Sequence, residues 1–402
     1  MPQIFIARQP IYDRKLDVHA YELLFRANGS DHHAKFTDGE QATSQLLVNA
    51  LMEIGLPKLV GTHPAFVNLT ERFIIEGLPN AMAPEQVVLE VLEDVLPGPE
   101  LLAALQRLKQ DGYTIALDDF EYDDSKRPLV ELANLIKLDV LNLSPHELRS
   151  HVSTLKAFDI PLLAEKVETQ EDFHTCNALG FDYFQGYFFC KPDLVKGEHT
   201  PSCRTLILRL LARIQDPQIE FKELADLIAQ DVSFSYRILR YINSAQFGTS
   251  RKIESIQSAA TMIGLQRIKT WLTILAMSQI DDKPYELLLT SLIRARMCEN
   301  LGKAAGQPTN SAFTTGLFSA LDALTDQPLE NVLASLPLAD DINRALLEHE
   351  GALGQLLGLV LAYESGDWDS VEAAAFDGIA PQKAYLEAVE WANQMSKALL
   401  SE

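Results

Sequence analysis

The sequence predicts an α/β barrel in the first half of the chain and an all-helical domain in the second half. Short apolar runs alternate with amphipathic stretches up to about residue 190, whereas only helical periodicity is left after Pro201. Apolar runs without alternation are typical of strands buried on both faces, and about eight of them favour a closed, TIM-like β/α barrel. The alternative, an open doubly wound sheet, lacks its usual glycine-rich phosphate loop.

The expected strands are residues 5–7, 20–25, 65–69, 87–92, 114–119, 135–139, 161–165 and 182–186. Amphipathic segments between them, such as 41–54 and 100–112, should cover the barrel, and Gly112 should end the second of these in a left-handed conformation.

We expect the barrel domain to span residues 1–198 and the helical domain residues 199–402. The polar stretch 193–202, which contains Gly197 and Pro201, reads as the linker. In the second half, apolar residues recur at i, i+3 and i+4 in residues 204–214, 222–230, 235–245, 266–280 and 382–399. We predict that residues 204–402 fold without the barrel.

Composition excludes several classes of function. The net charge is −22 and no dense run of Lys and Arg occurs, so a nucleic acid polymer is not an expected partner. No apolar stretch is long enough to span a membrane, and the first residues do not resemble a secretion signal. The four cysteines lack C-x-x-C spacing, which favours a reducing, cytoplasmic location. A small dianion held through metal ions is compatible with this charge.

Polar side chains stand at or near the C-terminal ends of most expected strands. They are Asn68, Glu90, Asp118 with Asp119, Lys137, Glu165 and Gln185. A lone acid at a strand end is more often a helix cap or a solvated residue, but parallel barrel strands bring their C-terminal ends to one mouth. This oxygen-rich set suits Mg²⁺ or Mn²⁺. The sequence therefore predicts a metal site at the mouth.

Motifs along nearly all of residues 3–192 resemble, in order, those of one known family. Residues 3–26 contain Glu22-Leu23-Leu24-Phe25-Arg26, which resembles the E-A-L-L-R signature of the EAL family of cyclic-di-GMP phosphodiesterases. Further matches are FVNLT with Asn68, VVLEVLED with Glu90 and Glu93, IALDDF with Asp118 and Asp119, LIKLD with Lys137, LLAEKVETQEDF with Glu165, and DYFQGY with Gln185, Gly186 and Tyr187. Together these motifs are specific, although Asp-Asp or Q-G-Y alone would be weak.

The resemblance implies hydrolysis of cyclic-di-GMP by one or two Mg²⁺ or Mn²⁺ ions. The implied ligands are Glu22, Asn68, Glu90 and Asp118 for the first metal, and Asp118 with Asp119 for the second. Lys137 would position the water, and Glu165 would act at the second metal or as the base. Arg26, Gln185, Gly186 and Tyr187 would contact the nucleotide, Gln185 would also complete the metal shell, and Glu93 would anchor a neighbouring loop. A homodimer is compatible with the resemblance.

The chain also departs from the family pattern. The family follows Asp-Asp-Phe with a glycine-rich loop, whereas residues 118–124 read DDFEYDD and contain no glycine. Leu92 replaces a Thr, Lys166 replaces a Gly, and the stretch from Lys137 to Glu165 is short for a helical crossover of the family. The metal ligands are thus retained while the loop that organises the second metal is not, which predicts impaired catalysis.

Residues 235–276 resemble the HDOD family of helical output domains, through LRYINSAQF, the run from Ile253 to Ala259, and Ile263-Gly264-Leu265. An active HD-type metal site needs several His and Asp ligands, but His349 is the one histidine after His199. This half is therefore expected to be a non-enzymatic module that binds a signalling protein.

Three hypotheses follow from these patterns. The first is a cytoplasmic bacterial signalling protein whose degenerate EAL barrel binds cyclic-di-GMP, a divalent metal or both, with little or no hydrolysis. The second is an active metal-dependent phosphodiesterase. The third is a protein-interaction scaffold that binds no nucleotide.

Overall fold

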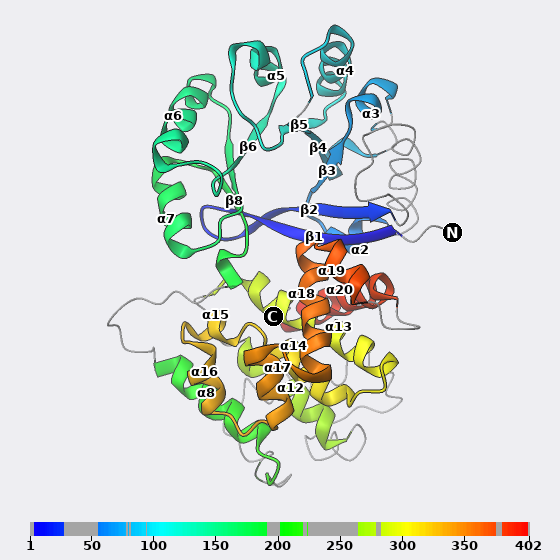
Figure 1. The fold of residues 1–402 in the computed structure, drawn as a ribbon, viewed down its shortest axis with the longest axis vertical. Helices are drawn as coiled ribbons and strands as arrows, with labels where there is room; N and C mark the ends of the chain where they lie inside the picture. The colour runs from blue at the N-terminus through cyan, green and yellow to red at the C-terminus, as the bar shows by residue number, and fades with distance from the viewer. Residues whose placement is uncertain are drawn as a thin grey trace. The chain divides into compact units, whose positions relative to one another are not determined.

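The computed structural model describes residues 4–27, 55–77, 79, 82–93, 95–190, 202–219, 223, 264–278, 283–374 and 380–400. The chain divides into two compact units (Figure 1). The barrel unit comprises Met1–Lys191 and Leu361–Val389, and the helical unit comprises Pro192–Val360 and Glu390–Glu402. The expected division at residue 198 differs from this grouping chiefly at the C-terminal end, because residues 361–389 belong with the barrel.

Eight strands form a closed barrel in sequence order, as predicted. They are β1 (Ile4–Asp13), β2 (Val18–Ala27), β3 (Ala65–Leu69), β4 (Val87–Val91), β5 (Thr114–Leu117), β6 (Leu135–Asp139), β7 (Leu162–Glu165) and β8 (Tyr183–Gln185). Seven of them are parallel to one another, but β1 runs antiparallel to both β2 and β8. The expectation of a wholly parallel barrel was therefore wrong for β1, which is also longer than the three apolar residues that marked it.

Helices surround the strands in Figure 1. They are α2 (Leu56–Val60), α3 (Glu71–Glu76), α4 (Pro99–Gln110), α5 (Arg127–Leu132), α6 (Pro145–Leu155) and α7 (Gln170–Leu179). Gly112 follows α4 with φ +93°, as predicted. The expectation of a shortened crossover between Lys137 and Glu165 was wrong: α6 has 11 residues, starts with Pro145 and carries a capping box between Ser144 and Glu147.

The C-terminal segment of the barrel unit contacts the first half of β1. Among the described residues β8 pairs with Ile11–Asp13, so Ile4–Pro10 have no strand partner on that side. The Tyr363 hydroxyl accepts from Ile6 N at 3.3 Å and donates to Ile6 O at 3.1 Å, and the Tyr385 hydroxyl accepts from Arg8 N at 3.1 Å. These hydroxyls satisfy backbone groups that an uncovered strand edge would leave free.

Aromatic packing accompanies these hydrogen bonds. Trp368 stacks on Phe5 with ring centroids 5.7 Å apart, and Tyr363 meets Trp368 edge-on at 5.2 Å. The segment consists of the end of α18 (Gly351–Ser365), all of α19 (Trp368–Ala373) and the first part of α20 (Pro381–Leu400). The prediction that residues 204–402 fold alone stays untested, but such a fragment would carry these aromatic residues without β1.

The described part of the helical unit contains α8 (Ser202–Gln215), α12 (Leu265–Met277), α13 (Tyr285–Ala304), α14 (Thr309–Phe318), α15 (Leu321–Thr325), α16 (Leu329–Ala334) and α17 (Asp340–Glu348). Gly316 lets α14 pack closely on α13, because a Cβ there would lie 2.4 Å from the Arg294 carbonyl oxygen. Trp271 is buried and lies beside the half-buried Trp391, which also contacts Phe313.

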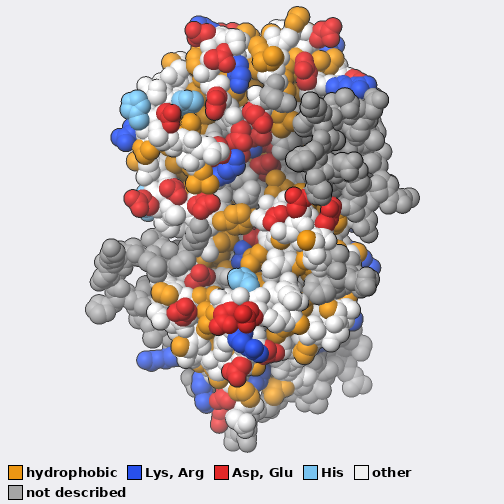
Figure 2. Space-filling model, viewed as in Figure 1, with side chains coloured by type: hydrophobic (Ala, Val, Ile, Leu, Met, Phe, Trp, Pro, Cys, Tyr) orange, Lys and Arg blue, Asp and Glu red, His pale blue; other side chains and the backbone are white. Residues whose placement is uncertain are grey.

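Several expectations fall wholly or largely on residues outside the described ranges: the helices 41–54, 222–230 and 235–245, the HDOD-like motifs up to Ile263, and the linker 193–202. No described helix is long and apolar enough to cross a membrane. On the face in view, basic side chains are scattered among acidic ones over the described surface (Figure 2).

Tyr363→Phe should lower the free energy of unfolding of the full chain by about 1–3 kcal/mol, because both backbone groups of Ile6 lose their partner. Urea denaturation would measure the change. Tyr122→Phe is the matched control, since its hydroxyl forms an exposed hydrogen bond with Asp124 and should not change the midpoint. Equal midpoints for all three proteins would contradict the role assigned to Tyr363.

Candidate functional site at the barrel mouth

The interior of the barrel contains a ring of apolar side chains, one from each strand. Its members are Ile11, Ala20, Phe66, Val88, Ala116, Leu135 and Leu163, with Tyr183 packed against them. Alternate residues of a strand point to the same side of the sheet, so the residue two positions further on points into the barrel as well. In the seven parallel strands these next positions lie toward the C-terminal mouth.

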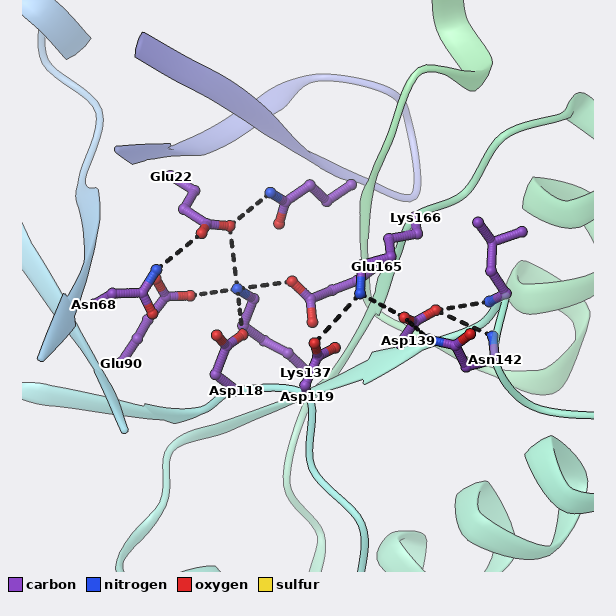
Figure 3. A network of polar contacts seen from close by, with 12 residues as sticks. Glu22, Asn68, Glu90, Asp118, Asp119, Lys137, Asp139, Asn142, Glu165 and Lys166 are labelled. Atoms are coloured by element: carbon purple, nitrogen blue, oxygen red, sulfur yellow. Dashed lines mark hydrogen bonds and ion pairs between the residues drawn. The ribbon is translucent and has the colours of Figure 1, made fainter. Parts of the chain in front are cut away.

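These next positions carry the polar residues that the sequence singled out. They are Glu22, Asn68, Glu90, Asp118, Lys137, Glu165 and Gln185, each two residues after a member of the apolar ring. Figure 3 shows most of them converging on one point. The predicted convergence of strand-end polar residues is thus present, and the strand period explains it.

Lys137 lies at the centre of this polar layer and is fully buried. Its Nζ is 2.5 Å from Glu90 Oε1, 2.7 Å from Asp118 Oδ1, 2.8 Å from Glu165 Oε1 and 3.1 Å from Glu22 Oε2 (Figure 3). An ammonium has three protons to donate, so four carboxylates share them and their charge exceeds that of the lysine. The layer therefore needs further positive charge or bound protons.

The pKa shifts show where protons are held in the absence of metal. Burial raises the pKa of Glu90 well above its usual range and that of Glu165 to about 8, in both cases against the attraction of Lys137. Burial acts in the same direction on Glu22, but Lys137 and hydrogen bonds from Gln185 and Asn68 outweigh it and lower the Glu22 pKa. Burial thus favours the protonated forms of Glu90 and Glu165, whereas Lys137 and its hydrogen bonds favour the ionised form of Glu22.

Several buried oxygen atoms of this layer have no hydrogen-bond partner. They are Asn68 Oδ1, Glu90 Oε2, Glu165 Oε2 and Gln185 Oε1. Buried acceptors are seldom left unsatisfied, and carboxylate and amide oxygens are the donors that Mg²⁺ and Mn²⁺ prefer. Within the described ranges, however, no three His, Cys, Asp or Glu side chains form a ready metal cage. Lys137 lies among the carboxylates that would have to form it. The residue types and orphaned oxygens thus fit a divalent cation, while the carboxylates are drawn toward the lysine.

Asp119, the predicted second-metal ligand, lies at the edge of the polar layer. Its backbone has φ +38° and its Oδ2 is 3.3 Å from Lys166 Nζ. The glycine-free segment that follows is a short loop leading to a 3-10 turn at Asp124–Lys126, which Asp123 caps by accepting from Ser125 N at 2.7 Å. The loop after Asp119 therefore has its own capping interactions in place of glycines.

The structure describes the predicted nucleotide-contacting residues to different extents. Arg26 lies in β2 opposite Phe5, and its side chain is outside the described residues. Gly186 has φ +149° and a Cβ there would lie 2.1 Å from the Val167 carbonyl oxygen, so glycine is required for close packing. Tyr187 follows it and is half-buried. Glu93 is exposed, and its backbone carbonyl lies 3.4 Å from Lys126 Nζ. The loop-anchoring role of its side chain stays a prediction.

The sequence patterns did not predict that Gln9, Asp139 and Lys166 take part in the polar contacts of the barrel mouth. Gln9 accepts from Gln185 Nε2 at 2.9 Å, and Gln185 Nε2 also donates to Glu22 Oε2 at 2.7 Å. Gln9 precedes Ile11 of the apolar ring by two residues, which is the equivalent position in an antiparallel strand. Asp139 follows Lys137 by two residues in β6, and Lys166 contacts it at 2.5 Å. Strand period could have indicated Gln9 and Asp139, but not the Lys166 contact.

Two known domain families match this chain: the EAL domain family model matches residues 2–192, and the HDOD domain model matches residues 200–325. The barrel is therefore an EAL-type domain. Uncharacterized protein YuxH of Bacillus subtilis (strain 168) is 35% identical over 98% of this chain and 100% of its own length. Cyclic di-GMP phosphodiesterase CdgJ of Vibrio cholerae is 32% identical over 98% of this chain and 94% of its own.

Among solved structures, an EAL domain protein from Listeria monocytogenes EGD-e is similar at 17% identity, covering 46% of this chain and 87% of that one, with a TM-score of 0.37. The full-length likeness to the two curated relatives and the two family matches agree. The chain therefore belongs to the EAL–HDOD family of signal-transduction proteins.

In metal-free buffer, the protein should lose stability as pH rises between about 4.5 and 8. Folded Glu165 keeps its proton up to a pKa of about 8, whereas an ordinary glutamate loses it near 4.5. The folded state thus binds the extra proton in this window, and the free energy of unfolding falls with rising pH, by up to about 1.4 kcal/mol per pH unit for one such group.

Glu165→Gln, which cannot ionise, should show a shallower slope when urea denaturation is repeated across this pH range. Glu131→Gln is the control, because Glu131 is an exposed residue of α5 paired with Arg127. An unchanged slope in Glu165→Gln would show that Glu165 is ionised in the folded protein at neutral pH.

Proposed function

We propose that this chain is a signalling protein whose barrel mouth binds cyclic-di-GMP together with a divalent cation and hydrolyses the nucleotide slowly or not at all. The observation that carries the proposal is the polar layer around Lys137, with its excess of carboxylates and its orphaned buried oxygens. Such a layer is suited to a cation, and a cation there would attract a phosphodiester.

The proposed metal ligands are Glu22, Asn68, Glu90 and Asp118, with Asp119 at the edge. A bound divalent ion would supply Lewis-acid stabilisation of phosphate charge and would lower the pKa of a bound water. Lys137 would orient that water, and Glu165 would take its proton. Gln185 would present its free Oε1, and Arg26, Gly186 and Tyr187 would lie along the nucleotide. Supporting the choice of nucleotide, CdgJ is named a cyclic di-GMP phosphodiesterase.

We propose slow hydrolysis because the loop after the proposed second-metal residue departs from the family motif, whereas all proposed ligands of the first metal are present. Asp119 is followed by a glycine-free loop and contacts Lys166, which by the motif resemblance takes the place of a glycine. Losing one of two metals removes several kcal/mol of charge stabilisation from the displacement at phosphorus. Since each 1.4 kcal/mol corresponds to about tenfold in rate, turnover would fall by a factor on the order of a thousand while binding changes little.

The second candidate is an efficient phosphodiesterase. It is favoured by the name of CdgJ and by the presence of every first-metal ligand at the mouth. The HDOD half is proposed, in either case, to bind a signalling protein, and a homodimer is compatible with both candidates.

Binding and turnover should separate in one experiment. Isothermal titration with cyclic-di-GMP and Ca²⁺ or Mg²⁺ should detect binding, and Glu22→Gln should weaken it at least tenfold because the polar layer loses an ionised oxygen. Glu131→Gln should bind like the wild type. Chromatography of Mg²⁺ reactions should show turnover below about 0.01 per second, against about 10 per second for a typical enzyme.

Fast turnover abolished in Glu22→Gln would establish the phosphodiesterase instead. If the wild type shows neither binding nor turnover, the scaffold hypothesis is favoured and the nucleotide proposal fails.

A further inference from the structure

A lysine and two aspartates form a second charged group beside the polar layer. Lys166 Nζ is 2.5 Å from Asp139 Oδ2 and 3.3 Å from Asp119 Oδ2 (Figure 3). Asp139 is 9% exposed, whereas the side chains of Asp119 and Lys166 are 37% and 48% exposed. The ammonium thus bridges one buried and one accessible carboxylate.

The buried carboxylate of this group is held in a fixed position. Asp139 ends β6, and its Oδ1 accepts from Leu141 N at 2.8 Å and from Asn142 N at 3.3 Å. Its Oδ2 accepts from Asn142 Nδ2 at 2.6 Å as well as from Lys166. Asp139 therefore offers the lysine a preorganised anion.

The residues before and after Lys166 are fixed in position. Glu165 before it ends β7, and Val167 after it donates its N–H to Gln185 O at 3.0 Å and accepts from Phe188 N at 3.1 Å. Lys166 itself has φ +56°, a conformation that disfavours residues other than glycine. A lysine at a position whose backbone conformation favours glycine is strained, and strained residues are typical of functional sites. The strain at Lys166 therefore points to a role for its side chain.

The two charged groups differ in how well they are compensated. Around Lys137, four carboxylates face one ammonium, which leaves room for a divalent cation. Around Lys166, two carboxylates face one ammonium, and a divalent ion placed at Asp119 would stand beside a positive charge. Repulsion between the Lys166 ammonium and a divalent ion bound at Asp119 would lower the affinity of Asp119 for that ion.

We propose that Lys166 is a built-in counter-cation for Asp119 and Asp139, so that the barrel mouth takes a single divalent ion, in the Lys137 layer, and excludes a second from Asp119. This rests on the proposed function, because the first ion is part of that proposal. Lys166 acts here as a positioning residue that sets metal stoichiometry. A metal-bound mouth with a lysine in place of a second ion would bind a phosphodiester without the full charge needed to cleave it.

The test is a count of bound Mn²⁺ per full-length chain, by electron paramagnetic resonance of the free ion during titration at fixed pH and ionic strength. The wild type should bind one ion. Lys166→Met removes the charge without introducing a glycine, so the backbone constraint at this position stays. This variant should bind two ions, the second at least tenfold more tightly than in the wild type. Lys166→Arg should restore a single ion, and Asp119→Asn in the Lys166→Met background should remove the second.

Lys166→Gly should also bind two ions, and Asp159→Gly controls for relief of backbone strain, since Asp159 is exposed and has φ +56° as well. One ion in both wild type and Lys166→Met would overturn the inference and leave the proposed function standing. Two ions in the wild type would overturn the inference and would also remove the reason given for slow hydrolysis, leaving only the proposed binding of cation and nucleotide. No ion in the wild type but one in Lys166→Met would refute the proposed first-metal site and support the lysine's role. No ion in either protein would refute both.

Discussion

The buried ammonium of Lys137 is the interaction on which the rest of the barrel mouth depends. Five strands or strand ends supply it and its four carboxylate neighbours, so the charges are compensated only when the barrel is closed. An ion pair broken in a protein interior destabilises it by about 3–5 kcal/mol, because a charge is left without a partner. The excess of carboxylates also keeps the layer incomplete, since protons or a metal must supply the remaining charge. The same arrangement thus underlies both the stability of the barrel mouth and the proposed cation binding.

The C-terminal segment of the barrel unit is linked to the polar layer through β1. Tyr363 and Tyr385 hydrogen-bond to β1, and β1 carries Gln9, which orients the amide of Gln185 next to Glu22. The helices α18 and α20 each contribute residues to both compact units. The barrel unit therefore includes residues from the end of the chain, although all eight barrel strands lie within residues 4–185.

Much of the barrel could be predicted because buried strands leave uninterrupted apolar runs, and the mouth residues because the C-terminal ends of parallel barrel strands meet at one mouth. This reasoning brought Glu90, Lys137 and Glu165 together, as the structure does. It could not give the direction of β1, since antiparallel and parallel strands have similar local patterns. Nor could it give the hydroxyl contacts of Tyr363, which join residues 357 positions apart in the sequence. The bridge from Lys166 to Asp139 depends on a loop conformation that composition does not encode.

We propose that the layer around Lys137 is a cation site and that Lys166 limits the barrel mouth to a single ion. Anomalous scattering from crystals of the full chain grown with Mn²⁺ tests this most directly, because it shows the position of each bound ion. We expect one peak, among Glu22, Asn68, Glu90 and Asp118. The absence of any peak there would contradict the cation site, and a second peak beside Asp119 with Lys166 turned away would contradict the single-ion account.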